Sequence, residues 1–222
     1  GFTVNMIPAF SAVAALWVEA GGVFALPNLR GGAELGEEWH RAGMLERKQN
    51  TFDDFTAAAE WLTRNGYADP ARIAVRGGSN GGLLVGAALT QHPGMFRAVL
   101  CKYPLLDMVR YHRFRIARLW VPEYGSAEDS AQFEVLRAYS PYHHVEKGAA
   151  YPAVLLATGD ADTRVDPLHA RKMTALLQAS TGSDRPVLLN YSLKAGHSQG
   201  RSIRDNVEDA AVDLHFLFWQ LG

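Results

Sequence analysis

A serine at position 79 lies in a run of small residues that suits nucleophilic chemistry. Residues 77–82 read GGSNGG, contain the pattern G-x-S-x-G, and separate the apolar residues 73–75 from the helix-like residues 83–89. A serine on so tight a turn between a strand and a helix is exposed at the top of a sheet, and glycines without a Cβ let the two elements close around it. The pattern therefore predicts that Ser79 is a nucleophile.

The same glycine-rich turn has two other interpretations, a plain connection and a phosphate-binding loop. Phosphate loops need a lysine directly after the glycines, or G-x-G-x-x-G with an acid about 20 residues further on. After these glycines the first lysine is Lys102 and the first acidic residue is Asp107, so neither phosphate pattern fits. Because G-x-S-x-G alone also occurs by chance, the other residues of the chain must decide between a nucleophile and a plain turn.

A serine hydroxyl becomes a strong nucleophile when a histidine takes its proton, and that histidine needs an acid to fix its tautomer. Asp160 and Asp162 follow the strand-like residues 153–157. Of the eight histidines, His197 lies on a loop of small residues between the strand-like residues 187–193 and the last helical pattern. We expect Asp162 to be the acid and His197 the base, with Asp160 bracing its turn through backbone N–H groups.

The remaining polar candidates favour structural roles. Asp166 directly precedes a proline, as the N-cap residue of a helix often does. Cys101 lies in an apolar, strand-like run, which is typical of a buried structural thiol. No metal site is expected, because neither an i, i+4 histidine pair nor cysteine partners accompany His143, His144 and His169.

The composition favours one globular domain over a nucleic-acid or membrane protein. The chain has 222 residues, of which 48% are apolar and 20% charged, and its formal net charge is −1. Its one basic cluster, which is interleaved with aromatic residues, predicts a helix face or a pocket rim rather than a nucleic-acid surface; it contains Arg110, Arg113, Arg115 and Arg118. The longest apolar stretch, residues 9–18, is too short for a membrane span. No signal-peptide pattern is visible, and we expect a cytoplasmic protein.

Strand-like and helix-like stretches alternate along the chain. The strand-like stretches are residues 23–26, 73–75, 98–102, 153–157 and 187–193, and the helical patterns are residues 10–20, 53–64, 83–92, 167–180 and 203–221. This alternation predicts an α/β fold with a mostly parallel sheet flanked by helices. A long loop is expected over residues 28–43, and residues 105–150 predict short helices and loops that form a pocket wall over the carboxyl ends of the strands.

Several motifs, in chain order, resemble the catalytic domain of the prolyl oligopeptidase family. They are residues 28–32 (NLRGG), Glu34, Gly36, Trp39, His40, residues 48–55 (KQNTFDDF), residues 77–82, residues 162–165 (DTRV) and residues 194–197 (KAGH). The resemblance covers essentially the whole chain, and Asn80 after the serine favours this branch over acylaminoacyl and dipeptidyl peptidases. It implies an α/β-hydrolase fold with Ser79, Asp162 and His197 as a catalytic triad that needs no cofactor.

The resemblance also implies a substrate site. The backbone N–H of Asn80 is then one oxyanion donor, Trp120 stacks on a substrate proline ring, and Arg164 bonds a substrate carbonyl. The rest of the specificity pocket is then lined by Phe2, Leu105, Tyr124 and Val165. Two structural alternatives stay open, namely that Trp120 is a plain core residue and that Arg164 pairs with Asp166.

By the same resemblance, a β-propeller, the first strands of the sheet and an oxyanion tyrosine precede residue 1. We therefore expect residues 1–222 to be the α/β-hydrolase catalytic domain of a longer protein. Its uncovered sheet edge predicts that this chain alone either self-associates through that edge or has low stability. The expected partner is a short peptide that is cleaved after proline. Two alternatives are a carboxylesterase without proline preference and a catalytically silent fragment that serves as a folding or binding module.

Overall fold

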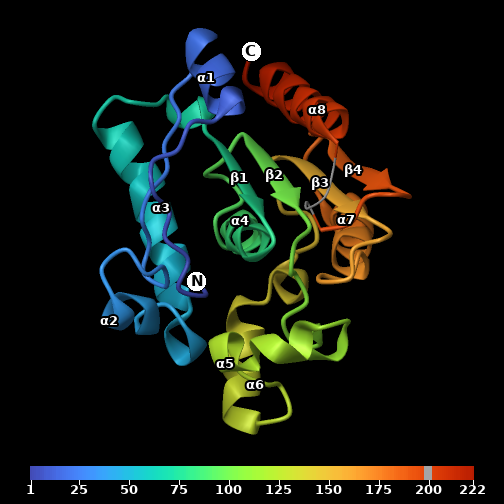
Figure 1. Cartoon of the computed structure of the whole chain (residues 1–222). Helices are drawn as coiled ribbons and strands as arrows, with labels where there is room; N and C mark the ends of the chain where they lie inside the picture. Colours follow the sequence, from blue (N-terminus) through green and yellow to red (C-terminus); the bar gives the residue numbers. More distant parts are fainter. Residues whose placement is uncertain (198–201) are drawn as a thin grey trace.

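The computed structural model describes residues 1–197 and 202–222, and Figure 1 shows a central sheet between helices. Within the described residues the sheet has four strands, all parallel, in the order β1-β2-β3-β4. The strands are β1 (Ala74–Gly78), β2 (Ala98–Lys102), β3 (Ala153–Gly159) and β4 (Val187–Ser192). Because all four run in the same direction, the loops that follow them meet at one edge of the sheet.

Strands β2 and β3 are apolar up to their carboxyl ends, at Lys102 and Thr158, because both of their faces are covered. Val99 pairs in register with Val154 and contributes to the core that contains α4 and α7 residues. On the other face Leu100 pairs with Leu155, and both pack with Phe216 from the last helix. Each such side chain contributes roughly 1.5–3 kcal/mol by leaving water, so the two-sided core fixes the register of the central strands.

Helices α4 and α7 cover one face of the sheet, with α3 packed outside α4, and α8 covers the other. The α-helices are α1 (Ala12–Glu19), α2 (Glu37–Arg41), α3 (Gln49–Arg64), α4 (Asn80–Gln91), α5 (Val121–Tyr124), α6 (Ser130–Tyr139), α7 (Leu168–Ser180) and α8 (Ile203–Leu221). The 3-10 turns are η1 (Leu45–Arg47), η2 (Pro70–Arg72), η3 (Tyr111–Arg113), η4 (Ala117–Trp120) and η5 (Pro141–His144). No helix of the described residues combines the length and the apolar character needed to cross a membrane.

The predicted α/β alternation is confirmed, with two shifts in the first third of the chain. Helix α3 begins at Gln49, four residues before the expected start, and α2 interrupts the loop expected over residues 28–43. Between β2 and β3 the chain forms the expected short helices and turns. The loops that follow β1, β3 and β4 therefore contain Ser79, Asp162 and His197.

The strand expected at residues 23–26 is wrong. These residues have no secondary structure, and Val23, Phe24 and Leu26 are each about half exposed, at 55%, 50% and 51%. An apolar run becomes a strand only where a neighbouring strand satisfies its backbone hydrogen bonds. Among the described residues β1 pairs with β2 alone, so this segment has no strand beside it.

Candidate active site

Ser79 occupies a strained turn between β1 and α4. Its φ of 58° and ψ of −118° place it in a region that a residue with a side chain rarely adopts. The turn depends on glycine, because a Cβ on Gly77 would lie 2.0 Å from the carbonyl oxygen of Gly81. The backbone N–H of Ser79 donates to the carbonyl of Lys102 at 2.9 Å. Local sterics and this anchor to β2 together fix the serine at the edge of the sheet.

The side chains of Ser79, His197 and Asp162 form a continuous chain of hydrogen bonds. His197 Nε2 lies 3.0 Å from Ser79 Oγ, and His197 Nδ1 lies 2.7 Å from Asp162 Oδ2. Asp162 is completely buried, and its other carboxylate oxygen accepts the backbone N–H groups of Arg164 and Val165, each at 2.9 Å. A proton on Nδ1 bonds the carboxylate and leaves Nε2 free to accept the serine proton, so this geometry suits a general base.

The loops that carry the acid and the histidine are in direct backbone contact. A Cβ on Gly159, at the end of β3, would lie 2.0 Å from the carbonyl oxygen of Ala195, and that oxygen also accepts the N–H of Ala161 at 3.2 Å. The N–H of Ala195 in turn donates to Ser192 Oγ at 3.1 Å. A glycine at position 159 is therefore required for the two loops to pack together.

The neighbouring aspartates take structural roles, one of them different from the expected role. Asp160 is exposed, and among the described residues its side chain accepts a hydrogen bond from the Tyr191 hydroxyl rather than from the N–H groups of its turn. The bracing expected of Asp160 is provided by Asp162, whose buried carboxylate can reach those N–H groups. Asp166 precedes Pro167, the N-cap residue of α7, and its side chain accepts the N–H of Leu168, the first residue of the helix, at 2.9 Å, so it binds the helix start from one position before the predicted N-cap place.

Asn80 begins α4, so its backbone N–H belongs to the first helical turn, where N–H groups have no partner within the helix. Its side chain is held by Tyr124, whose hydroxyl donates to Asn80 Oδ1 at 2.7 Å. Burial raises the pKa of Tyr124 well above its usual range, so this hydroxyl stays a donor. Phe2 packs edge-on against the Tyr124 ring, with centroids 5.4 Å apart.

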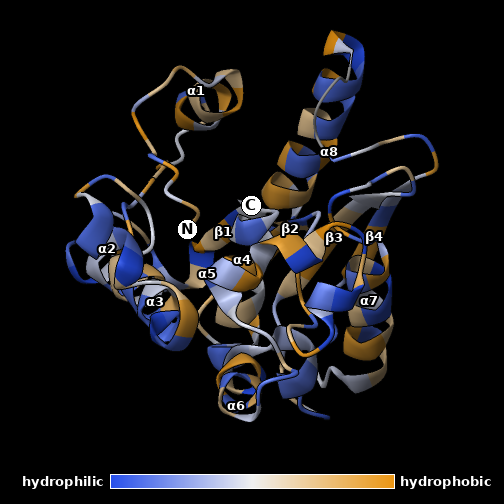
Figure 2. Cartoon of the chain, turned by 60° about the horizontal axis from the view of Figure 1, so that its bottom comes forward, coloured by the Kyte–Doolittle hydropathy of each residue, from blue (hydrophilic) through white to orange (hydrophobic). Residues whose placement is uncertain are grey.

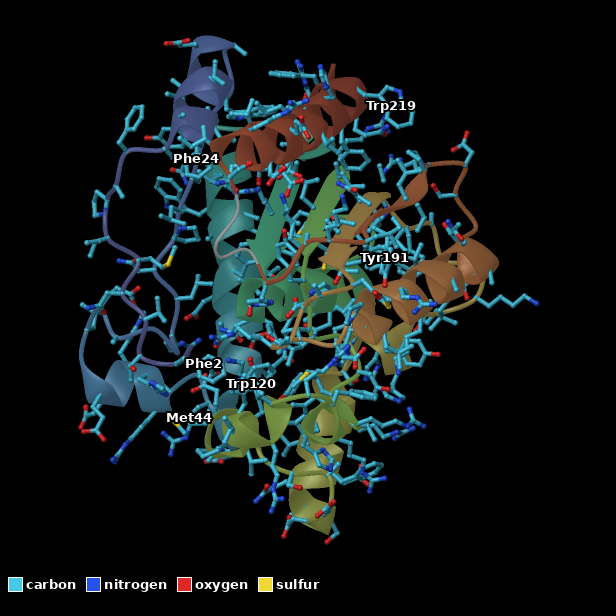
Figure 3. The ribbon with its side chains drawn as sticks, turned by 45° about the vertical axis from the view of Figure 1, so that its right-hand side comes forward. Phe2, Phe24, Met44, Trp120, Tyr191 and Trp219 are labelled. Atoms are coloured by element: carbon cyan, nitrogen blue, oxygen red, sulfur yellow. The ribbon has the colours of Figure 1, made fainter. Side chains whose placement is uncertain are left out.

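The residues expected to line the specificity pocket are brought together. Leu105, Tyr124 and Val165 are buried in one apolar cluster, and Phe2 and Trp120 pack against it while partly exposed. Figure 3 shows Phe2 and Trp120 close to each other, far from Phe24 and Trp219. Trp120 is therefore partly exposed at the rim of this cluster rather than fully buried.

Arg164 is exposed beside this apolar cluster. The pairing with Asp166 that was left open does not occur, because Asp166 pairs with Arg115 instead, at 3.2 Å. The arrangement keeps the Arg164 guanidinium at the surface next to the buried Val165.

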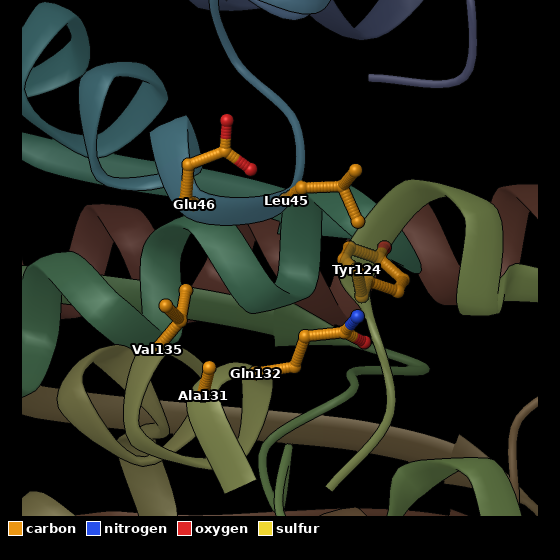
Figure 4. Close-up of a pocket in the computed structure, with 6 residues that line it drawn as sticks. All are labelled: Leu45, Glu46, Tyr124, Ala131, Gln132 and Val135. Atoms are coloured by element: carbon orange, nitrogen blue, oxygen red, sulfur yellow. The ribbon is translucent and has the colours of Figure 1, made fainter. Parts of the chain in front are cut away.

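A cavity of about 190 Å³ adjoins the site through Tyr124. Figure 4 shows Tyr124 facing side chains from η1 and α6 across it, and the residues that line it are Leu45, Glu46, Tyr124, Ala131, Gln132 and Val135. The lining is largely aliphatic and contains no residue of the triad.

A buried ionic cluster supports the other side of Tyr124. Glu123 pairs with Lys48 at 3.3 Å and with His40 Nε2 at 3.0 Å. Lys48 is 1% exposed, desolvation lowers its pKa, and its Nζ lies 5.2 Å from the centre of the Tyr124 ring. Sequence reasoning missed this cluster: His40 and Lys48 belong to motifs of the family resemblance, but Glu123 lies far along the chain in α5, and no motif indicates that the three side chains meet.

A parallel sheet with a serine on a strand-turn-helix elbow, followed by an aspartate and a histidine after later strands, defines an α/β-hydrolase catalytic domain. Comparison with known families agrees with this class. The chain belongs to the prolyl oligopeptidase family, whose model matches residues 8–222.

Similar proteins cover the whole chain. It is 44% identical to a prolyl endopeptidase of Elizabethkingia miricola, matching 100% of this chain and 32% of the relative. It is 42% identical to prolyl oligopeptidase ophP of Omphalotus olearius, matching 100% of this chain and 30% of the relative. The chain thus spans about a third of the length of the curated relatives it matches.

Solved structures give the same result. A prolyl endopeptidase structure superposes with a TM-score of 0.97 at 52% identity, over 100% of this chain and 33% of the other. Prolyl oligopeptidase B from Galerina marginata, bound to a 35-residue substrate, gives a TM-score of 0.96 at 37% identity, over 100% of this chain and 31% of the other.

Proposed function

We propose that this chain is a serine peptidase domain that hydrolyses short peptides on the carboxyl side of proline, through an acyl-enzyme on Ser79. The observation that carries the proposal is the hydrogen-bonded series Ser79, His197 and Asp162, with separations of 3.0 and 2.7 Å. Such a series activates a serine without a metal or a cofactor.

The geometry supports acyl transfer in two steps. His197 Nε2 takes the proton from Ser79 Oγ as that oxygen attacks the substrate carbonyl carbon, and the buried Asp162 stabilises the resulting imidazolium. The negative oxygen that forms is stabilised by the backbone N–H of Asn80. His197 then gives its proton to the leaving amine, and water, deprotonated by the same histidine, attacks the acyl-enzyme and restores Ser79.

The apolar cluster beside the elbow supports a preference for proline. The partly exposed Trp120 offers a flat, rigid ring on which a pyrrolidine ring can stack, and Phe2 and Tyr124 belong to the same apolar cluster. The Arg164 guanidinium lies at the surface, where it can donate to a substrate carbonyl.

The similar proteins support the same residue types. Three solved structures of prolyl oligopeptidase B from Galerina marginata are alanine variants of a serine, a histidine and an aspartate, each bound to a peptide substrate. In this chain the three residues of those types at the elbow are Ser79, His197 and Asp162.

Two measurements test the proposal. A fluorophosphonate probe should label the wild-type protein and leave Ser79→Ala unlabelled; equal labelling of both would contradict a nucleophilic Ser79, and labelling of neither would indicate a silent binding module. The second measurement compares a proline-containing peptide amide with a short-chain ester. Turnover of the ester without turnover of the amide would show that the domain is a carboxylesterase rather than a peptidase.

A further inference from the structure

Strand β2 is followed directly by a strained residue that the proposed mechanism does not use. Tyr103 follows Lys102 with a φ of +46°, in the left-handed region, and it precedes a proline. Bulky residues rarely adopt positive φ, and residues before proline favour extended backbone, so two local preferences are violated together. The N–H of Tyr103 nevertheless donates to the carbonyl of Ala157 on β3 at 2.7 Å. The surrounding structure therefore holds this residue in place.

The Tyr103 side chain lies against the histidine of the triad. It is 7% exposed, and its ring centroid is 5.5 Å from the centroid of the His197 imidazole, with the planes at 58°. The two nitrogens of that imidazole already contact Asp162 and Ser79. Two hydrogen bonds fix two points of a ring, and a third contact is needed to fix its plane.

The backbone around Tyr103 is packed between the elbow and the histidine loop. On the elbow side, Lys102 accepts the N–H of Ser79, and a Cβ on Gly82 would lie 2.7 Å from Pro104 Cβ. On the other side, Tyr103 and Ala195 line the same small polar cavity, about 10 Å³ in volume and therefore large enough for about one water molecule. Tyr103 thus lies between the elbow, which its neighbours Lys102 and Pro104 contact, and a water-sized cavity that it shares with the histidine loop.

From these contacts we propose that Tyr103 is a positioning residue, whose aromatic ring fixes the plane of the His197 imidazole between Asp162 and Ser79. The inference rests on the proposed function, because it assigns Tyr103 a role only if His197 is the base. The strained backbone places the ring on the imidazole, and packing on both sides keeps it there. The contribution is made in the step in which the serine proton is transferred, so it should appear in kcat rather than in KM.

The test compares Tyr103→Leu, which removes the aromatic ring, with Tyr103→Phe, which keeps it, in the protein as its gene encodes it. Both replacements face the same backbone strain as tyrosine, so strain is matched between them. We expect Tyr103→Leu to lower kcat on a proline peptide by roughly 10- to 100-fold, with KM within about twofold, since small misplacements of a catalytic group have effects of this size. Tyr103→Phe should keep kcat within about threefold of the wild type.

A double-mutant cycle separates positioning from general damage to the fold. In a His197→Ala background, Tyr103→Leu should cause no further loss of the residual turnover of an activated ester, because there is no imidazole left to orient. A further loss equal to that seen in the wild-type background would overturn the proposal. Equal kcat losses in the Phe and Leu variants would overturn it too, because the hydroxyl would then be the important group.

Thermal unfolding of each variant shows whether it is folded, and Tyr103→Met replaces the leucine variant if that one does not fold. An aliphatic variant that folds and keeps full kcat contradicts the role of Tyr103 alone. Full turnover in His197→Ala instead contradicts the proposed function. The two failures are therefore distinguishable.

Discussion

The carboxyl edge of the sheet and the N-terminal arm (residues 3–26) are organised differently. At the sheet edge, loops after β1, β3 and β4 bring Ser79, Asp162 and His197 into hydrogen-bond contact. In the arm, α1 has no buried residue, and Figure 2 shows it in largely apolar colours and apart from the sheet.

The arm is attached through few contacts. Trp17 stacks on Phe218 of α8 with centroids 5.3 Å apart, and the N–H of Met6 donates to Glu34 Oε1 at 2.8 Å. The comparison teaches that an apolar sequence defines a rigid element only where neighbours cover it. Changes at the sheet edge should therefore have large effects, and changes in the arm should have small ones.

Removal of the nucleophile or the base should have the largest effect. Ser79→Ala and His197→Ala should each lose nearly all turnover of a proline peptide, on the order of 10⁶-fold in kcat, because the members of a triad act as a unit. For the same reason the double variant should be hardly slower than either single one. Steady-state kinetics on all three variants checks this, and additive losses in the double variant would exclude a shared step.

The acid should come next. Asp162→Asn leaves the side-chain shape but favours the wrong histidine tautomer, so kcat should fall by about 10⁴-fold. Asp160→Asn is the matched control two residues away, because Asp160 is exposed and contacts the Tyr191 hydroxyl. Its kcat should stay close to that of the wild type, and the opposite ranking would make Asp160 the acid.

Acid should destabilise the sheet edge through His169. His169 lies in the first turn of α7, and its Nδ1 accepts the N–H groups of Leu106 and Asp107 at 3.2 and 3.1 Å. Burial lowers the pKa of His169 to about 4, below the unfolded value of about 6.5. Its contribution is therefore present above about pH 6.5 and lost as the pH falls towards 4, by about 3 kcal/mol in all.

Denaturant unfolding at several pH values measures this loss. His169→Gln removes the titrating group and should flatten the stability profile between pH 6.5 and 4. His144→Gln, at an exposed histidine, should leave the profile unchanged. An unchanged slope in His169→Gln would assign the acid sensitivity to other groups.

The specificity pocket should give a smaller, selective effect. Trp120→Ala should weaken transition-state binding of a proline peptide, as measured by kcat/KM, by about 1–3 kcal/mol, because the substrate's proline ring loses its stacking partner. A small acetate ester, which does not fill the pocket, should be hydrolysed at nearly the wild-type rate. Equal losses on both substrates would show that Trp120 serves packing rather than recognition.

The arm should give the smallest effect on stability. Val23→Lys and Phe24→Lys, at half-exposed positions, should each change the free energy of unfolding by no more than about 0.5 kcal/mol. The same changes should reduce the self-association that we propose for the apolar arm and the free outer edge of β1. Light scattering over a concentration series measures it; a wild-type chain that stays monomeric would contradict this proposal.

Much of the fold could be predicted from the sequence pattern, because β2 and β3 are covered on both faces and their short apolar runs are typical of buried parallel strands. The elbow was predictable because local sterics dictate its glycines. The strand predicted at residues 23–26 is wrong because an apolar pattern does not show whether a neighbouring strand is present. Tyr103 and the ion pair of Lys48 with Glu123 were not predictable, because each depends on contacts between segments distant in the chain.

The backbone contact between Gly159 and Ala195 has a mechanical consequence for the triad. It holds Asp162 and His197, the proposed acid and base, together with β3 and β4, whereas Ser79 lies between β1 and α4. In the proposed triad, the 3.0 Å contact between Ser79 Oγ and His197 Nε2 is therefore the one that joins these two parts of the sheet. A shear between them would separate Ser79 from His197 and leave the 2.7 Å contact between His197 and Asp162 in place.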